Sequence, residues 1–377
     1  MTSITSQTGG LADPAATTAR LTIDLSAIVE NWRTMRALSG EASCGAAVKG
    51  NAYGTGMAEA AVALAKAGCR QFFVADANEG AALRKLLPDA EIFILSGAFD
   101  AAMPLLVENR LTPVLNSLDQ IAAWTSAGND RPAALHIDTG MNRLGITPAE
   151  AVEIAENRAV EPTLVMSHFA CADSPDHPLN AIQIERFAEV RGHFPEARAS
   201  LANSAGIHMG DAAGFDLTRP GIALYGGECR NDLPNPMRPV AKAEARILTN
   251  RVAKAGETVS YGATVTLGRD TRIAICGIGY ADGFHRSSSG SGVPLRREVQ
   301  QAGMGAIEGR TVPLLGRVTM DLLMFDVTDL PETLGVSGQW IELFGETIPL
   351  DDAARAAGTI GYELLTSLGR RYARRYI

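Results

Sequence analysis

The chain has 377 residues, a length that predicts two domains, and its 46% hydrophobic and 20% charged residues are ordinary for a globular protein. Its formal net charge of -8 argues against nucleic acid or an anionic membrane surface as the main partner. Five cysteines without a Cys-X-X-Cys pair and the lack of a bilayer-length apolar stretch predict a cytoplasmic protein.

The first nineteen residues are rich in Thr, Ala and Ser and predict a disordered tail, neither signal peptide nor anchor. From residue 20 to 239, β-type runs alternate with helical segments, two of which begin with the capping-box pairs Ser117 with Gln120 and Thr147 with Glu150. The β-type runs are residues 44–49, 71–75, 91–96, 111–116, 133–138, 163–169, 198–203 and 216–219. Eight strand–helix units in series predict an α/β fold with a (β/α)8 TIM-type barrel. A doubly wound sheet should instead have a Gly-X-Gly-X-X-Gly turn after its first strand, which is missing.

Residues 240–377 have a different pattern, in which β-type runs are separated by glycine turns, and they predict a separate, mostly β domain. These runs are residues 243–249, 258–267, 272–278, 311–315, 322–327 and 340–344. We expect a linker at residues 231–239 and a mobile loop tip at residues 287–292. The basic C-terminal run predicts a solvated or partner-facing edge.

The distinctive polar motifs of the first domain all follow predicted strands. Lys49 ends the first run, His168 lies near the end of the sixth, and Arg219 ends the eighth. Each has an ordinary alternative, as a solvated loop lysine, a structural histidine and a turn arginine. Because active residues of a (β/α)8 barrel gather at the carboxyl ends of its strands, the shared placement favours an active site.

A lysine at the end of a buried strand is partly dehydrated, so its amine is available to form a Schiff base with an aldehyde. Ser204 and the backbone amides of Gly221 and Ile222 predict a pocket for a phosphate group. Together, these features favour pyridoxal 5'-phosphate as the cofactor. The six histidines show no His-X-His or His-Glu-X-X-His spacing, so we expect no metal site.

Several motifs resemble the alanine racemase family, in the family's order, from about residue 20 to 362. The matching motifs are Val48-Lys49-Gly-Asn-Ala-Tyr53-Gly, His136-Ile-Asp-Thr-Gly-Met-Asn-Arg143, Ser167-His-Phe-Ala, Asn203-Ser204-Ala-Gly, Arg219-Pro-Gly-Ile-Ala-Leu-Tyr-Gly226, Val259-Ser-Tyr261-Gly, Gly279-Tyr280-Ala-Asp-Gly283 and Gly316-Arg317-Val-Thr-Met320-Asp321. The resemblance implies a fold-type III pyridoxal phosphate enzyme with a barrel, a β domain and a head-to-tail homodimer whose active sites are shared. It also implies interconversion of L- and D-alanine, with supply of D-alanine for peptidoglycan as the expected role and degradation of D-alanine as the open alternative.

The resemblance also implies roles for individual residues. Lys49 resembles the cofactor lysine and one catalytic base, and Tyr261 from the other subunit resembles the opposing base. Arg219 resembles the partner of the cofactor's ring nitrogen, and His168 the residue behind its ring. The remaining expected cofactor-binding residues are Tyr53, Asn203, Ser204, Gly221, Ile222 and Tyr362.

Arg143 and Met320, the latter from the partner chain, resemble the substrate-binding residues. Positions that line the substrate entrance of the family match Asp173, Tyr280, Arg286 and Arg317. Racemisation removes a proton from one face of Cα and returns one to the other, which explains the need for two bases.

Two residues depart from the family pattern. A lysine, commonly carbamylated, often stands at the position of His136, where it holds the arginine equivalent to Arg143. We therefore expect His136, a water or a bound anion to orient Arg143. Gly361 stands where asparagine is common, which weakens the assignment of Tyr362.

Four alternative functions make different demands on the sequence. A racemase for serine, lysine or several amino acids shares all these residues, although Tyr280 and Tyr362 favour a small side chain. A fold-type III decarboxylase usually has a glycine-triplet loop, which is missing, and would leave Tyr261 without a function. A non-catalytic pyridoxal phosphate carrier would lack residues 240–377. A metal-dependent barrel hydrolase conflicts with the histidine spacing.

Overall fold

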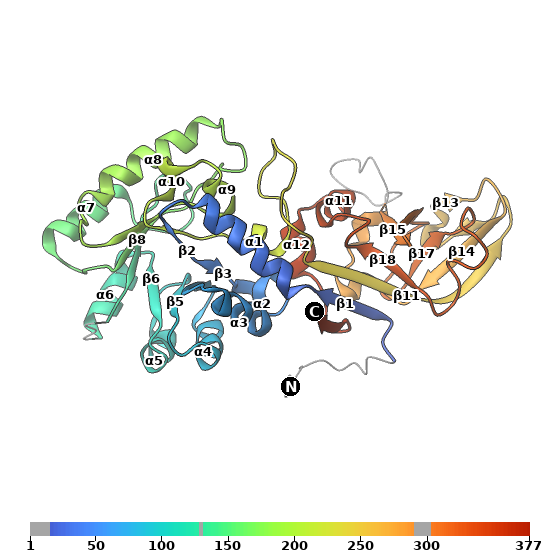
Figure 1. Ribbon diagram of the computed structural model, residues 1–377, viewed down its shortest axis with the longest axis horizontal. Helices are drawn as coiled ribbons and strands as arrows, with labels where there is room; N and C mark the ends of the chain where they lie inside the picture. Colours follow the sequence, from blue (N-terminus) through green and yellow to red (C-terminus); the bar gives the residue numbers. More distant parts are fainter. Residues whose placement is uncertain (1–15, 128–130, 290–302) are drawn as a thin grey trace. The chain divides into compact units, whose positions relative to one another are not determined.

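The computed structural model describes residues 16–127, 131–289 and 303–377 (Figure 1). The chain divides into two compact units, which we describe separately. The barrel unit comprises residues 25–238, and the β unit comprises residues 1–24 and 239–377. The expected disordered tail falls mostly on residues 1–15, and the expected loop tip includes residues 290–292, which lie outside the described residues.

The barrel unit alternates strands with helices, as predicted. Its strands are β2 (Ser43–Cys44), β3 (Ala46–Ala47), β4 (Gln71–Val74), β5 (Glu91–Ile94), β6 (Thr112–Leu115), β7 (Ala134–His136), β8 (Leu164–Met166), β9 (Arg198–Ser200) and β10 (Leu217–Thr218). Its helices are α1 (Leu25–Leu38), α2 (Lys49–Tyr53), α3 (Met57–Ala67), α4 (Ala77–Leu86), η1 (Asp100–Ala102), α5 (Met103–Glu108), α6 (Leu118–Ser126), α7 (Pro148–Asn157), α8 (Pro178–Arg191), α9 (Ser204–Ile207), α10 (Asp211–Gly214) and η2 (Ile222–Tyr225).

Parallel pairing closes these strands into a ring. Strands β3 to β9 form one sheet in sequence order, and β10 pairs with β2, which leads directly into β3. Backbone hydrogen bonds from Asp216 N to Ala199 O (3.0 Å) and from Arg219 N to Ala202 O (2.9 Å) connect the flanks of β10 and β9. Each of the eight predicted runs contains a strand of this ring, and the predicted barrel is confirmed.

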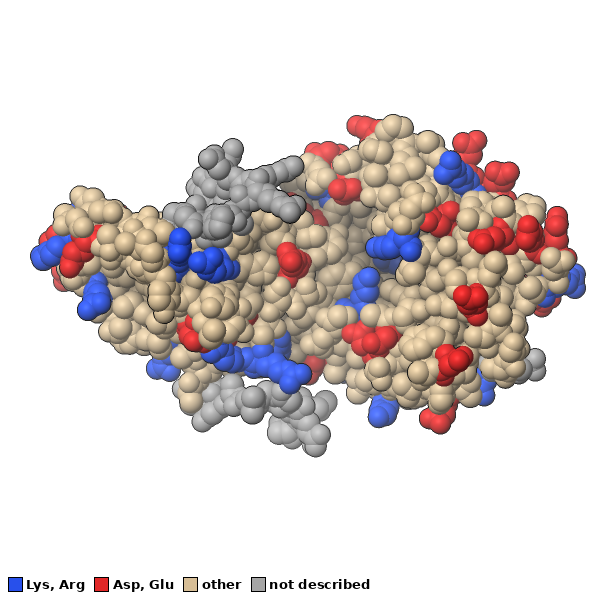
Figure 2. All heavy atoms as spheres, turned by 180° about the vertical axis from the view of Figure 1, so that it is seen from behind, with Lys and Arg blue, Asp and Glu red and all other residues tan. Residues whose placement is uncertain are grey.

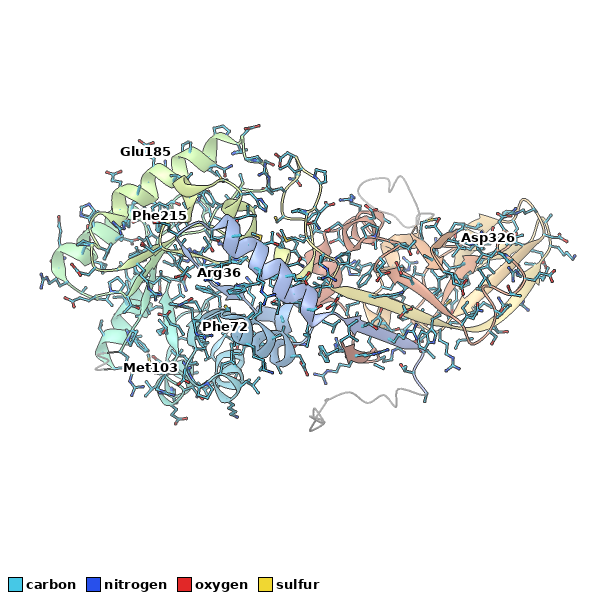
Figure 3. All side chains as sticks on the ribbon, viewed as in Figure 1. Arg36, Phe72, Met103, Glu185, Phe215 and Asp326 are labelled. Carbon is cyan, nitrogen blue, oxygen red and sulfur yellow. The ribbon has the colours of Figure 1, made fainter. Side chains whose placement is uncertain are left out.

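Successive side chains of each barrel strand point to opposite faces of the sheet, so the strands contribute to one core inside the barrel and another outside it. Phe73, Phe93, Val114 and Leu164 belong to a buried cluster that spans successive strands, and the rings of Phe73 and Phe93 stack with centroids 4.7 Å apart. The adjacent Phe72 (Figure 3) is also buried, but its side chain points to the opposite face of β4. Buried on both faces, the strands have the continuous apolar sequences that made them predictable.

Capping side chains fix the starts of several helices. The Thr147 hydroxyl and the Glu150 carboxylate form the complete predicted capping box of α7. In α6, Ser117 accepts from Gln120 N, but the Gln120 side chain accepts instead from Asn116 N (2.9 Å), so only half of the second predicted box forms.

The β unit is built around the long strand β11, as the predicted mostly β domain requires. Its strands are β1 (Ala19–Ile23), β11 (Ala241–Ala253), β12 (Thr258–Val259), β13 (Val265–Thr266), β14 (Thr271–Cys276), β15 (Met304–Ile307), β16 (Arg310–Pro313), β17 (Leu323–Asp326), β18 (Trp340–Phe344) and β19 (Ala373–Tyr376). Its helices are η3 (Tyr261–Ala263), η4 (Tyr280–Asp282), η5 (Arg286–Ser289), α11 (Leu350–Ala356) and α12 (Gly361–Thr366). The sheet has the order β16-β15-β18-β11-β1-β19, and β14 pairs with both β11 and β17.

Two segments differ from the expectation. Ala19 was predicted to end the disordered tail and residues 20–24 to begin the barrel domain, but β1 (Ala19–Ile23) pairs antiparallel with β11 and parallel with β19, so it belongs to the β unit. Residues 287–289 were predicted to be a mobile loop tip, but they lie in η5, where the Ser287 hydroxyl donates to Ala357 O (2.7 Å) and Ser289 Oγ accepts from Val318 N (2.8 Å). In both places pairing with distant residues decides the structure.

On the face shown in Figure 2, acidic and basic side chains are interspersed among uncharged residues. Among the residues that the structure describes, no helix is long and apolar enough to cross a lipid bilayer.

Candidate active site

Lys49 follows the first barrel strand directly. Val48, the residue before it, is buried and donates its amide to Phe73 O (2.9 Å), so the backbone at this point is anchored in the sheet. The Lys49 side chain is solvent-accessible in the isolated chain, but surrounding protein atoms partly desolvate its amine. This desolvation lowers the pKa of Lys49, and the positive charges of Arg143 and Arg219 lower it further, while Glu79 opposes them. The direction of this shift is the one that the sequence predicted for a reactive lysine.

Arg219, at the carboxyl end of β10, is a buried cation. Its guanidinium donates to Ser200 Oγ (2.5 Å) and Ser167 O (2.6 Å), and lies 3.3 Å from His168 Nδ1. All acceptors that the described residues offer to it are neutral. Burial lowers the pKa of Arg219 to about 9, so the side chain still carries its charge at neutral pH. A buried charge without a counter-charge is suited to an electron-rich ligand atom.

His168 is held beside Arg219 by its own backbone. Its carbonyl accepts from Gln183 Nε2 (2.9 Å), and the same amide group donates to Thr139 Oγ1 (3.1 Å). Burial lowers the pKa of His168 well below its usual value, and the charges of Arg219 and Arg143 add to this effect. His168 is therefore neutral at physiological pH.

His136, at the end of β7, has a tautomer fixed by its neighbours. Asn116 Nδ2 donates to Val114 O (2.7 Å) and Leu95 O (3.1 Å), so its Oδ1 faces His136 Nδ1 at 2.8 Å. Nδ1 must therefore carry the proton, which leaves Nε2 as an acceptor. Burial, with a contribution from Arg219, lowers the pKa of His136 to about 4.

Arg143 is exposed in the loop after β7. Its charge contributes to the lowered pKa of Lys49, of His136 and of His168. The structure thus brings Lys49, Arg143, His168 and Arg219 into one positively charged site. Such a site is suited to an anionic ligand.

The residues predicted to form a phosphate pocket come from two loops and one tyrosine. Ser204 Oγ accepts from Gly221 N (2.8 Å) and Ala223 N (3.4 Å), so hydroxyl and amides lie together. A Cβ at Gly221 would lie 2.3 Å from the hydroxyl oxygen of Tyr53, so only glycine permits this approach. Burial raises the pKa of Tyr53 to about 12, which keeps its hydroxyl a donor.

The other two predicted residues of this region occupy different positions. Ile222 begins η2 directly after Gly221 and is buried. Asn203 caps α9, where its Oδ1 accepts from Gly206 N (2.9 Å). Asn203 is thus a helix cap in the structure.

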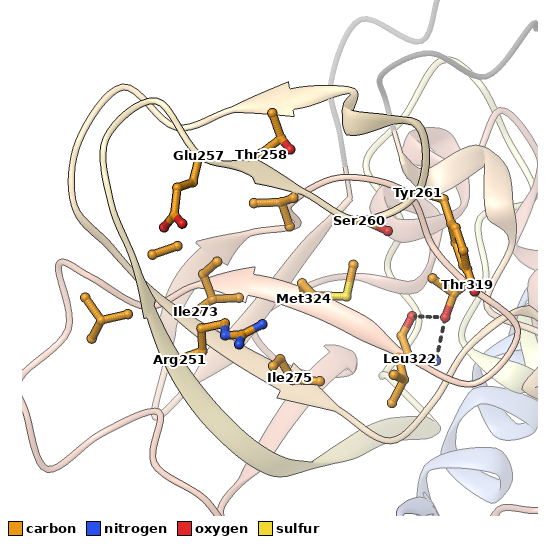
Figure 4. A pocket seen from close by; sticks show the side chains of 13 residues that line it. Arg251, Glu257, Thr258, Ser260, Tyr261, Ile273, Ile275, Thr319, Leu322 and Met324 are labelled. Atoms are coloured by element: carbon orange, nitrogen blue, oxygen red, sulfur yellow. Dashed lines mark hydrogen bonds between the residues drawn. The ribbon is translucent and has the colours of Figure 1, made fainter.

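Tyr261 lies in the β unit, on a strained turn. Ser260, Gly262 and Ala263 have positive φ values of 65°, 75° and 46°. The Tyr261 side chain is 73% exposed. It lies at the edge of a groove of about 610 Å³ that also includes Val252, Thr319, Leu322 and Met324 (Figure 4). The tyrosine predicted to act in another subunit is therefore presented to the outside of its own β unit.

Met320, Tyr280 and Arg317 are brought together with this turn. Tyr280 N donates to Thr319 O (3.0 Å), Ala281 N donates to Met320 O (3.1 Å), and Arg317 O accepts from Ser260 Oγ (2.8 Å). Met320 is 54% exposed. Four residues predicted for one site, which come from three sequence motifs, thus share one region of the β unit.

The remaining predicted residues are scattered. Asp173 is exposed in the barrel unit and accepts from Asn231 Nδ2 (2.9 Å), and Arg286 is exposed at the start of η5. Tyr362 is half-buried in α12. The glycine before it is explained by packing, because a Cβ at Gly361 would lie 2.5 Å from Asp351 Oδ1.

Several supporting residues were missed at the sequence level. Tyr225 stacks on Tyr53 with ring centroids 4.8 Å apart and donates to Ala47 O (2.8 Å). Tyr225 belongs to the matching motif that begins at Arg219, and nothing else in the sequence indicated its supporting role. Asn116, Gln183 and Ser200 act through contacts with residues distant in the sequence, which no local pattern indicates. Within the described ranges, no group of three or more His, Cys, Asp or Glu side chains is arranged to hold a metal ion.

A parallel barrel with a lysine directly after its first strand, joined to a separate β unit, is the architecture of the fold-type III class of pyridoxal phosphate enzymes. Sequence models of the alanine racemase N-terminal and C-terminal domains match residues 23–229 and 240–376. The chain belongs to the alanine racemase family.

Individual relatives are similar over nearly their whole length. An alanine racemase of Rhizobium meliloti is 53% identical over 95% of this chain and 96% of its own length. A biosynthetic alanine racemase of Agrobacterium fabrum is 51% identical over 95% and 93%, respectively. The crystal structure of alanine racemase from Bartonella henselae with covalently bound pyridoxal phosphate has a TM-score of 0.87 at 36% identity, covering 96% of this chain and 99% of that one.

Proposed function

We propose that the protein interconverts L-alanine and D-alanine with pyridoxal 5'-phosphate, using Lys49 on one face of the substrate and Tyr261 of a second subunit on the other. The observation that carries the proposal is the placement of Lys49 after the first barrel strand, beside Arg143 and Arg219. Similarity to proteins named alanine racemase over 95% of the chain supports the choice of substrate.

The residues of the barrel unit fit the cofactor chemically. Lys49 would hold its aldehyde carbon, and Tyr53, Ser204, Gly221 and Ile222 would bind its phosphate. When bound, pyridoxal phosphate acts as an electron sink for the bond that loses its proton. The cationic site formed by Lys49, Arg143 and Arg219 complements its negative charge.

Arg219 would contact the ring nitrogen of the cofactor. Burial lowers its pKa only to about 9, so the guanidinium keeps its proton at neutral pH among neutral acceptors. A ring nitrogen that accepts a hydrogen bond without gaining a full proton withdraws electrons less strongly. This arrangement favours proton return at Cα over side reactions such as transamination.

Lys49 and Tyr261 would move the protons. The lowered pKa of the Lys49 amine favours the neutral form that can accept a proton from Cα. The Tyr261 hydroxyl would donate to or accept from the opposite face. Arg143 and the backbone of Met320 would bind the substrate carboxylate, while Asp173, Tyr280, Arg286 and Arg317 would line the entrance. Tyr362 would add a further phosphate contact.

A head-to-tail homodimer would bring Tyr261 to the second chain's lysine. The exposure of Tyr261 and Met320 at one region of the β unit supports this assembly, because a catalytic base must be covered from water when it acts. A lone subunit would be inactive. In the cell, we place the enzyme in the cytoplasm as a source of D-alanine for peptidoglycan, a role supported by the biosynthetic relative.

Replacing Lys49 tests the assignment. The purified Lys49→Ala protein should lose the visible absorbance of the covalently held cofactor and about a thousandfold or more of its racemisation of alanine. Lys66→Ala, which changes an exposed lysine of α3, is the matched control and should retain both. Wild-type protein that shows neither property would refute the proposal.

Rates with D- and L-isomers of alanine, serine and lysine separate the main proposal from the broader racemase. We expect alanine to be preferred. Equal rates for all three amino acids would establish the broader racemase instead, and release of carbon dioxide would identify a decarboxylase.

A further inference from the structure

The chain makes an unusual turn immediately after Lys49. Gly50, Asn51, Ala52 and Tyr53 have φ values of 62°, 54°, 53° and 53°, which is one turn of left-handed helix. Three of these residues have a Cβ, and each pays a steric cost in this conformation. The turn must therefore be held by its surroundings.

Internal hydrogen bonds hold part of the turn. Ala52 N donates to Val48 O (2.8 Å), Gly54 N to Gly50 O (2.8 Å) and Gly56 N to Asn51 O (2.9 Å). The amide of Asn51 is bound from outside, because it donates to Glu79 Oε1 (3.1 Å).

Glu79 is well placed to anchor this amide. It lies in the first turn of α4, where Asp76 caps the helix and accepts from Glu79 N (3.0 Å). Its second carboxylate oxygen accepts from Ala75 N (2.9 Å), just after β4. The Glu79 carboxylate thus connects the end of β4 to the turn that follows the neighbouring strand β3.

The turn determines where two residues of the proposed site are presented. Lys49 precedes it, and Tyr53 closes it with its hydroxyl packed against Gly221. We propose that Glu79 is a positioning residue that holds the left-handed turn through Asn51 and so fixes both Lys49 and Tyr53. This inference rests on the proposed function for its effect on catalysis, but not for its effect on the turn.

The charge of Glu79 has a second effect. The negative charge of Glu79 raises the pKa of Lys49, whereas the positive charges of Arg143 and Arg219 lower it. His168, the other titratable group that interacts with Lys49, is neutral. Loss of the Glu79 charge should lower the Lys49 pKa further, so the acid limb of the rate profile should move to lower pH.

Two variants separate hydrogen bonding from charge. In Glu79→Gln the charge is lost. One of the two carboxylate oxygens is replaced by an NH2 group, which cannot accept the hydrogen bond from Asn51 N or Ala75 N. In Glu79→Asp the charge remains, but the side chain is too short to bridge Asn51 and Ala75. Glu59→Gln is the matched control, because it removes a negative charge from the first turn of α3.

The test uses the holoenzyme and two measurements. Hydrogen–deuterium exchange of the segment 49–57 should rise about tenfold or more in both Glu79 variants and stay unchanged in Glu59→Gln. The acid limb of kcat/KM should shift downward by at least about half a pH unit in Glu79→Gln, with little shift in Glu79→Asp.

The outcomes distinguish the two proposals. Unchanged exchange in both Glu79 variants would overturn the positioning role, whatever the activity. Raised exchange in the Glu79 variants, with a wild-type holoenzyme that does not racemise alanine, would support the positioning role and refute the proposed function. Raised exchange with an unshifted acid limb in Glu79→Gln would overturn the effect of its charge on Lys49.

Discussion

His136 shows how a single buried residue links the site to stability. Its ring donates to Asn116 Oδ1, and its pKa is lowered from 6.5 to about 4, so the folded protein keeps it neutral where an unfolded chain would protonate it. As pH falls from 6.5 to about 4, the unfolded state therefore binds the proton first and stability is lost. Above pH 6.5 neither state is protonated and the effect vanishes.

Replacing His136 should reduce this acid sensitivity. In His136→Asn the amide nitrogen can still donate to Asn116, but no group titrates. Between pH 7.5 and 5, the wild type should lose about 2 kcal/mol more than the variant, which corresponds to roughly 4 °C in melting temperature. His193→Asn, at an exposed position, should behave like the wild type. Equal acid losses in His136→Asn and the wild type would contradict the prediction.

At the scale of elements, Arg371 joins two turns of the β unit. Its guanidinium donates to both carboxylate oxygens of Asp282, which is 1% exposed, and to Asp321 Oδ1 (2.7 Å). Asp282 closes η4, which carries Tyr280, and Asp321 follows Met320. The basic C-terminal run, expected to be a solvated or partner-facing edge, thus also supports residues proposed to contact the substrate.

Arg371→Ala should therefore affect both stability and substrate binding. The carboxylate of Asp282 would lose its counter-charge, which we expect to cost about 2 kcal/mol because water can reach the vacated position. Looser turns at Tyr280 and Met320 should raise KM for alanine about fivefold, with a smaller change in kcat. Arg375→Ala, at an exposed residue of β19, is the control. The same KM in both variants would refute the supporting role.

The elements that sequence predicted are those whose signal is local. The barrel strands are buried on both faces, so their apolar runs stand out, and Lys49 and Arg219 were found because they end such runs. Strand β19 was missed because it is an edge strand with two arginines, which a sequence pattern does not distinguish from a solvated run. Strand β1 was predicted as the lead-in to the barrel because its partners, β11 and β19, lie far along the chain. Glu79 was missed because its partners, Asn51 and Ala75, are defined only by the folded backbone.

At the scale of the whole molecule, the proposed chemistry is divided between two units. Lys49, His168 and Arg219 belong to the barrel unit, whereas Tyr261 and Met320 belong to the β unit. The barrel strands hold the first group rigidly, and Tyr261 is exposed on its strained turn. If Tyr261 acts on the lysine of a second chain, each site needs one intact residue from each subunit.

Mixing two inactive variants tests this division directly. Lys49→Ala retains Tyr261, and Tyr261→Phe retains Lys49, so each homodimer lacks one base at both sites. In a mixed dimer one site carries both defects and the other carries none. If equal amounts are dissociated and reassembled at random, half of the dimers are mixed, and about a quarter of all sites should be intact. Racemisation should therefore recover to about a quarter of the wild-type rate, since sites act independently in this scheme. A mixture with no recovery, although mixed dimers are detected by differently tagged chains, would show that each subunit uses its own tyrosine.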